Sequence, residues 1–155
     1  MQVLMTVMVT WFSINFGLPA NDVHPHVQFA SATEMAEVRQ GRLASIRAAG
    51  VADEIGDRAQ LEFAHSVQAI YDDQSRTIYL PEGWTGETPA EVSVLVHELV
   101  HYMQNVAGLK YDCAEAREKP AYQAQARWLE LFGKSLADEF EIDAMTILVR
   151  TNCMQ

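Results

Sequence analysis

The stretch that decides the fold runs from residue 88 to residue 108 and reads TPAEVSVLVHELVHYMQNVAG. Thr88 is a favourable N-cap residue, Pro89 suits the first position of a helix, and Glu91 completes a capping box with Thr88. Gly108 is well placed to end the helix. These signals predict a helix that begins at Pro89 and runs to about Val106.

The predicted helix carries the pattern H-E-x-x-H, with His97 and His101 on either side of Glu98. Residues four apart lie on the same face of a helix, so both imidazoles can reach one metal ion, and Glu98 lies beside them. The apolar residues fall on a different face, which we expect to pack on the core while the histidines line a cleft. These apolar residues are Val92, Leu95, Leu99, Met103 and Val106.

A catalytic zinc ion usually has three protein ligands and keeps one position for water. No histidine follows His101, so a third histidine at the spacing of the metzincins is excluded. Three acidic residues follow within the next seventeen positions, namely Asp112, Glu115 and Glu118. We therefore expect the third ligand to be a carboxylate.

The segments HELVHYMQ (residues 97–104) and EKPAYQAQ (residues 118–125) resemble the gluzincin branch of the zinc metallopeptidases. The segments look like the minimal gluzincin-like domains of uncharacterised bacterial proteins, and the likeness covers about residues 67–130. It implies an α+β, zincin-like fold that is mostly helical, with a small antiparallel sheet or hairpin before the H-E-x-x-H helix. It further implies that His97, His101 and Glu118 bind Zn²⁺ and that Glu98 is the general base.

The same resemblance implies a zinc-dependent hydrolase, a metallopeptidase that cleaves peptide or other amide bonds with a peptide or protein as its substrate. In such a fold the hairpin before the helix provides an edge strand, and residues Thr77–Leu80 are expected to face an extended peptide. An alternative function is a non-catalytic zinc-binding domain with a structural or protein-interaction role. Glu98 favours catalysis, because a purely structural site has no use for a base between its ligands.

Pro120 leaves the assignment of Glu118 open, because two helix starts compete in this region. If Asp112-Cys113-Ala114-Glu115 is a capping box, the helix begins near Cys113 and Pro120 kinks it. If Pro120 lies in the first turn, Glu118 stands at the start of the helix. Glu115 and Asp112 accordingly remain alternative ligands. Tyr102, Tyr111 and Tyr122 are candidate oxyanion donors, with a buried structural role as the alternative for each.

The rest of the chain predicts a single domain over residues 1–155, with one helix before the first loop and several elements around the motif. Gln2, Thr6, Thr10 and Ser13 form one polar stripe on the first helix, whose other faces are apolar. The further elements are a short strand at 27–29, a helix from the capping box at 31–34 to about Gly50, a hairpin of 67–71 and 77–80, and helices at 121–132 and 136–149.

The composition and net charge of the chain argue against two classes of partner. The formal net charge is −10 with only 11 Lys and Arg residues, which argues against nucleic acid and against anionic membrane surfaces. The first helix is short and carries a polar stripe, so we do not expect stable insertion into a membrane. His24 and His26 form a possible second metal-binding patch, but no acidic or cysteine residue stands at a useful spacing from them.

The two cysteines, Cys113 and Cys153, are forty residues apart, and the second lies almost at the C-terminus. A bond between them would tie down the tail and would indicate a secreted or periplasmic protein. Two buried free thiols are the alternative, because the sequence does not show that the sulfurs meet.

Overall fold

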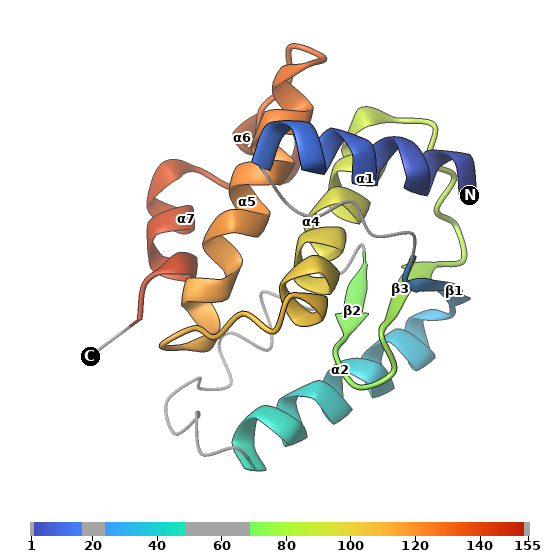
Figure 1. Ribbon diagram of the computed structural model, residues 1–155, viewed down its shortest axis with the longest axis vertical. Coiled ribbons are helices and arrows are strands. Elements are labelled where there is room, and N and C mark those ends of the chain that lie inside the picture. Colours follow the sequence, from blue (N-terminus) through green and yellow to red (C-terminus); the bar gives the residue numbers. More distant parts are fainter. Residues whose placement is uncertain (1, 17–23, 49–68, 154–155) are drawn as a thin grey trace.

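The computed structural model describes residues 2–16, 24–48 and 69–153. This part of the chain is α+β, with six helices and a small three-stranded mixed sheet (Figure 1). In chain order the elements are α1 (Gln2–Phe16), β1 (His26–Ala30), α2 (Ala32–Ala48), β2 (Ile70–Asp72), β3 (Thr77–Pro81), α4 (Pro89–Val106), α5 (Ala114–Glu130), α6 (Leu136–Phe140) and α7 (Ala144–Thr151). None of these described helices has the length and apolar character needed to cross a membrane.

The sheet has the strand order β1-β3-β2. The predicted hairpin is present, since β2 and β3 are antiparallel, but β1 adds a parallel neighbour on the other side of β3. The expectation that Thr77–Leu80 forms an edge strand is therefore wrong, because β3 is hydrogen-bonded on both sides. A parallel partner far away in sequence leaves no trace in the local pattern of β3. Among the described strands, β1 and β2 are the edges.

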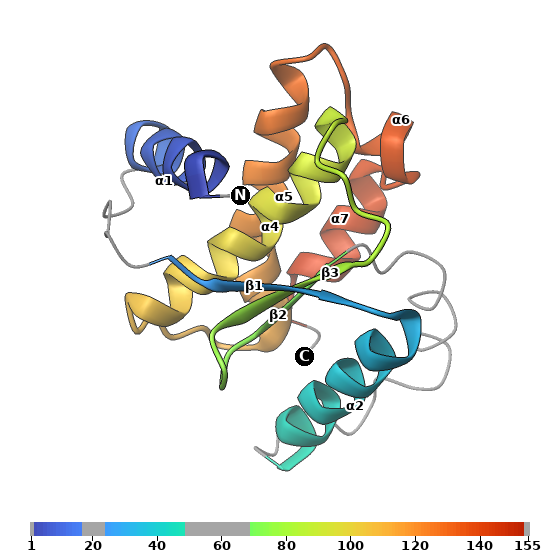
Figure 2. The same ribbon diagram turned by 90° about the vertical axis from the view of Figure 1, so that its right-hand side faces the viewer.

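Helices cover both faces of the sheet, as Figure 2 shows with α2 on one side and α4 on the other. Side chains alternate between the faces, as the two-residue period of a strand requires. Ile78 and Leu80 belong to the main core with residues of α4, whereas Ile70 and the half-buried Tyr79 pack in a smaller cluster with Met35 of α2. The site described below lies on the α4 side.

Helix α4 has the predicted bounds and the predicted capping box. The backbone N–H of Glu91 donates to Thr88 Oγ1 at 3.1 Å, and the N–H of Thr88 donates to Glu91 Oε2 at 3.2 Å. Unlike the prediction of one packed face, α4 is buried on nearly all sides, because α1, α5 and the sheet surround it. The additional buried residues include Val94, Val96, Val100 and Tyr102.

The first helix packs through fewer of its apolar residues than predicted. Met5, Met8 and Phe12 are buried in the main core, and Thr6 and Thr10 are exposed as the polar stripe requires. Val3 and Val7, which we expected to pack, are exposed. The predicted end of the second helix near Gly50 and the start of the hairpin at Val67 lie outside the described residues.

The region around Pro120 follows the first of the two helix starts. Cys113 is the N-cap of α5, its sulfur accepts a hydrogen bond from the N–H of Ala116, and the helix continues through Pro120. The single helix expected over 136–149 is wrong, because it is two helices. Glu141 has a φ of 56°, and the side chain of Asp143 accepts from the N–H of Thr146 at 2.7 Å, so it caps a new helix.

Cys113 and Cys153 form a disulfide, with their Cα atoms 5.8 Å apart. Of the two alternatives for these residues, the bonded one is therefore correct. The bond joins the start of α5 to the chain just after α7, and it holds α7 beside α5 (Figure 1).

Candidate metal centre

The candidate centre lies between α4 and α5, which pack antiparallel. The direction follows from their contacts, since residue numbers rise along α4 as they fall along α5. His97 contacts Gln125, His101 contacts Glu118, and Gln104 contacts Arg117. The H-E-x-x-H face of α4 is therefore set against the middle and first part of α5, where the acidic residues of the sequence lie.

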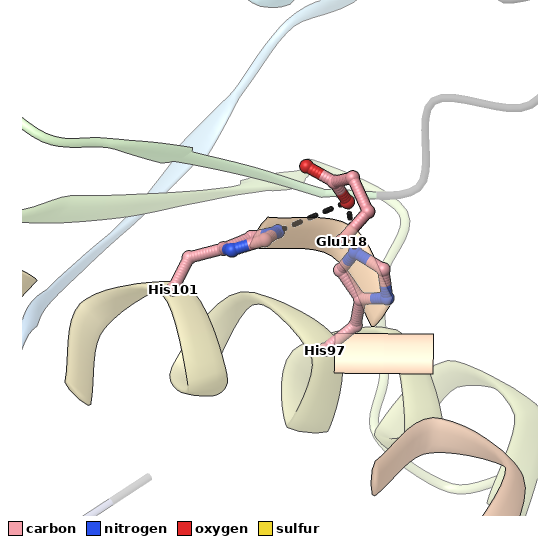
Figure 3. Close-up of side chains that lie close together, drawn as sticks. All are labelled: His97, His101 and Glu118. Atoms are coloured by element: carbon pink, nitrogen blue, oxygen red, sulfur yellow. Dashed lines mark hydrogen bonds and ion pairs between the residues drawn. The ribbon is translucent and has the colours of Figure 1, made fainter. Parts of the chain in front are cut away.

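His97, His101 and Glu118 point toward one another (Figure 3). One carboxylate oxygen, Oε2 of Glu118, lies 3.1 Å from Nε2 of His97 and 3.2 Å from Nε2 of His101. The ligand atoms of the three residues all lie within 4.8 Å of one another, so the group could hold a metal ion. Two imidazole nitrogens and one carboxylate oxygen are a donor set that suits zinc.

The three side chains differ in their exposure to solvent. That of His101 is 1% exposed, that of His97 12%, and that of Glu118 26%. The group is thus anchored in the core at His101 and open to solvent at Glu118.

The electrostatics of the centre are dominated by contacts within the group. Burial lowers the pKa of His97, but the hydrogen bond and charge of Glu118, with the charge of Glu98, outweigh burial and raise it above 6.5. Burial raises the pKa of Glu118, but the two histidines outweigh this and hold it well below 4.5. In the protein without metal, a proton on His97 beside a charged Glu118 is therefore favoured.

Glu98 lies next to this group but is not one of its members. Its side chain is buried, and Oε2 accepts a hydrogen bond from the backbone N–H of Tyr71 in β2 at 2.8 Å. The carboxylate is thus fixed between α4 and the edge strand. A carboxylate that is held beside a possible metal site without being a ligand can act as a base.

Two glutamines that the sequence does not single out contact the histidines at Nδ1, the ring nitrogen that does not face Glu118. Nδ1 of His97 lies 3.1 Å from Oε1 of Gln125, and Nδ1 of His101 lies 3.0 Å from Oε1 of Gln104. Both glutamines are buried. Helical spacing could have indicated them, because Gln104 is three residues after His101 and Gln125 is seven after Glu118.

Of the three candidate tyrosines, Tyr122 is the one that lies at the centre. Its ring is 4.8 Å from the ring of His97, measured between centroids, and its hydroxyl accepts a hydrogen bond from Nη1 of Arg150 in α7 at 3.1 Å. Tyr102 instead packs edge to face on Tyr71 in the core. Arg150 was not predicted, because nothing in the sequence places α7 beside α5.

The other predicted ligands are not part of the group. Within the described part of the chain, neither Glu115 nor Asp112 joins a cluster of metal-binding side chains, and neither do His24 and His26. Of the three acidic candidates, Glu118 is the one in the group, because it lies on α5 one turn beyond Glu115, opposite His101.

Comparison with known proteins identifies a family. Residues 43–155, which are most of the chain and include α4, α5 and the disulfide, match the family described as Domain of unknown function (DUF6647). No curated protein and no solved structure matches the chain. The chain therefore belongs to the DUF6647 family, a domain of unknown function.

Proposed function

We propose that this protein is a zinc-dependent hydrolase, a gluzincin-type metallopeptidase with a zincin-like fold that cleaves peptide or other amide bonds. The observation that carries the proposal is the convergence of Nε2 of His97, Nε2 of His101 and Oε2 of Glu118 beside a separate, fixed carboxylate. In this proposal His97, His101 and Glu118 hold Zn²⁺, and Glu98 is the catalytic base.

When bound, zinc supplies Lewis acidity that polarises the scissile carbonyl and lowers the pKa of bound water. Glu98 takes the proton from the attacking water and gives it to the leaving amine. Its hydrogen bond from Tyr71 supports this role, because that bond fixes one carboxylate oxygen and keeps the side chain on the β2 side of the histidines.

Tyr122 and Arg150 are proposed to stabilise the negative charge that develops on the carbonyl oxygen. The Tyr122 hydroxyl accepts from Arg150, so its own proton remains available for donation. A donor directed at a developing oxyanion stabilises the transition state more than the substrate. The contact of Tyr122 with the ring of His97 supports this role.

The substrate in this proposal is a peptide or protein in an extended conformation. β2 is an edge among the described strands, and its Tyr71 N–H already reaches the base Glu98. A peptide aligned with β2 would therefore pass beside Glu98, which replaces the role first expected of β3. The disulfide supports action outside the cytosol, as a secreted or periplasmic protein, and we propose that the whole chain acts as one domain.

The test combines metal content with turnover. Protein purified without chelators is assayed for bound zinc, and the wild type and Glu98→Gln are then compared on a broad peptide library. The proposal requires stoichiometric zinc in both proteins and cleavage by the wild type alone. Equal cleavage by both proteins would refute the role of Glu98. Stoichiometric zinc without cleavage by either would favour a non-catalytic zinc-binding domain.

A further inference from the structure

We infer that Gln104 and Gln125 are positioning residues that hold both histidines in the tautomer needed to bind a metal through Nε2. This inference rests on the proposed function, because it concerns the same centre. Each ring has one nitrogen directed at a glutamine and the other at Glu118. Which nitrogen carries the proton follows from the hydrogen-bond donors and acceptors around each glutamine.

The orientation of Gln125 is fixed by Ser93. The Ser93 hydroxyl donates its only proton to the carbonyl of Ala90 at 2.7 Å, so toward Gln125 its oxygen is an acceptor. Nε2 of Gln125 donates to that oxygen at 3.3 Å. The carbonyl oxygen of Gln125 is therefore the atom that faces His97, and it can only accept. Nδ1 of His97 must carry the proton in their 3.1 Å contact.

The orientation of Gln104 is fixed by Arg117, whose guanidinium has donors only. Nε of Arg117 donates to Oε1 of Gln104 at 3.2 Å, and Nε2 of Gln104 donates to the backbone carbonyl of Arg117 at 3.1 Å. Both ends of the amide are thereby assigned. Because Oε1 can only accept, Nδ1 of His101 must also carry the proton in their 3.0 Å contact.

The position of Arg117 is itself fixed by Asp73, in the turn between β2 and β3. Its two terminal nitrogens donate to the two carboxylate oxygens of Asp73, each at 2.6 Å, and one of them also donates to the backbone carbonyl of His101 at 3.3 Å. A bidentate pair of this kind fixes both the position and the plane of the guanidinium. The tautomer of His101 thus depends on a chain of contacts that begins in the turn after β2.

The consequence is that, with Nδ1 of each ring protonated, Nε2 is the atom left for the metal, and both Nε2 atoms present a lone pair to the same point once a metal replaces the proton that faces Glu118. A histidine that carries its proton on Nδ1 binds metal through Nε2, and the partner of Nδ1 sets both the tautomer and the basicity of the ligand. Here both partners are neutral amides, not carboxylates. The glutamines therefore orient the rings without adding negative charge, which leaves the bound metal more electrophilic and less tightly held than carboxylates would.

The experiment compares zinc affinity, measured by competition with a chelator, in variants that differ only at the partner of Nδ1. Gln125→Leu removes the acceptor and should weaken zinc binding about 10–100-fold, the usual effect of losing an outer partner of a ligating histidine. Gln125→Glu keeps an acceptor of higher basicity and should tighten binding. Gln123→Leu changes an exposed glutamine of the same helix and is the matched control, with affinity unchanged.

These outcomes separate positioning from a merely structural role. A structural role predicts that Gln125→Leu and Gln125→Glu both weaken zinc in proportion to a lower melting temperature, because both lose the bond to Ser93. Either that result, or wild-type affinity in Gln125→Leu, would overturn the inference. The same series at Gln104 tests His101.

Ring nitrogen chemical shifts of the zinc-loaded protein test the tautomers directly. In ¹⁵N spectra both rings should carry hydrogen on Nδ1 and bind the metal through Nε2. Metal bound through Nδ1, with hydrogen on Nε2, in either ring would overturn the inference. These readouts are also independent of turnover, so a protein that binds zinc with Nδ1–H tautomers but cleaves no peptide would refute the proposed function and support this inference.

Discussion

Oε2 of Glu98 accepts a hydrogen bond of 2.8 Å from the backbone N–H of Tyr71. The two residues are 27 positions apart in the sequence, so the contact joins α4, which carries the candidate metal centre, to the edge strand β2. Because of this contact, we expect a substitution of Glu98 to affect both stability and turnover. Two different substitutions can separate these effects.

Glu98→Ala and Glu98→Gln should therefore differ in stability but not in activity. Alanine leaves the buried N–H of Tyr71 without an acceptor, which costs about 1–3 kcal/mol of unfolding free energy, whereas the glutamine carbonyl can still accept. Both variants lose the base, so both should lose about 10²–10⁴-fold in peptide hydrolysis. Urea unfolding and steady-state kinetics measure the two effects. Equal stability of the variants would show that the bond to Tyr71 contributes little.

Glu118→Ala should lose the metal, and Glu115→Ala should keep it. Glu118 places a carboxylate oxygen beside both histidines, whereas Glu115 lies one turn earlier on α5 outside the group. Removing a direct ligand should reduce zinc affinity by more than the 10–100-fold expected for an outer partner. Chelator competition gives the affinities, with Glu115→Ala as the control. Loss of zinc only in Glu115→Ala would contradict the assignment.

The metal-free protein should be most stable between about pH 4.5 and 6.5. The pKa of His97 is raised above 6.5, so its contribution is complete below that value and is lost as the pH rises through the folded pKa. The pKa of Glu118 is lowered well below 4.5, so its contribution is complete above 4.5 and is lost as the pH falls through the folded pKa. Thermal unfolding after treatment with a chelator measures this profile.

Zinc affinity should increase with pH, whereas the contribution of His97 to the stability of the metal-free protein decreases. Because zinc competes with the proton on His97, affinity should increase as the pH rises through the raised pKa of that residue, and binding should release protons. Calorimetric titration in buffers of different ionisation enthalpy counts the protons released. Affinity that does not change between about pH 6 and 8 would exclude His97 as a ligand, since histidine binds metal only when neutral.

Tyr122→Phe should reduce turnover and leave zinc affinity unchanged. It removes only the hydroxyl that accepts from Arg150, and the ring contact with His97 can remain. Loss of one donor to an oxyanion typically costs about 10²–10³-fold in kcat. Arg150→Leu should lower kcat in the same direction, and Tyr79→Phe, on the α2 side of the sheet, is the matched control. Full activity of Tyr122→Phe would remove Tyr122 from the mechanism.

Loss of the disulfide should destabilise the protein by about 4 kcal/mol in the chain-entropy model, for a sequence separation of 40. Cys113→Ser is the cleanest variant, because serine can still cap α5. Chemical unfolding of the variant and of the reduced wild type should give the same free energy. A variant as stable as the oxidised wild type would contradict the expected effect of the bond.

Local signals explain which parts of the fold could be predicted. The start of α4 follows from Thr88, Pro89 and Glu91, because the hydrogen bonds of the capping box form within one turn of the chain. The pairing of β1 with β3 could not be predicted, because its register depends on residues about fifty positions apart. The break between α6 and α7 was missed because the apolar spacing continues across it, while Glu141 in the left-handed conformation ends α6 and the side chain of Asp143 caps the start of α7.

The residues of the candidate site also fall into two groups, those that local spacing predicts and those that depend on tertiary packing. His97, Glu98 and His101 follow from spacing on a single helix, so the sequence alone predicts that they lie together. Family resemblance, and not local spacing, points to Glu118, and only the packing of α5 on α4 brings it to the histidines. The glutamines and Arg150 depend on tertiary contacts between helices, which no local pattern encodes.

The link between Cys113 and Cys153 also determines what a proteolytic cut would do. Leu131 and Phe132, just after α5, are exposed, and they lie inside the loop that the bond closes. A protease that cuts there produces two polypeptides, one with Glu118 and the other with Arg150, and the sulfurs keep them covalently joined. Such a nicked, two-chain form would migrate as one species on a non-reducing denaturing gel and as two fragments after reduction.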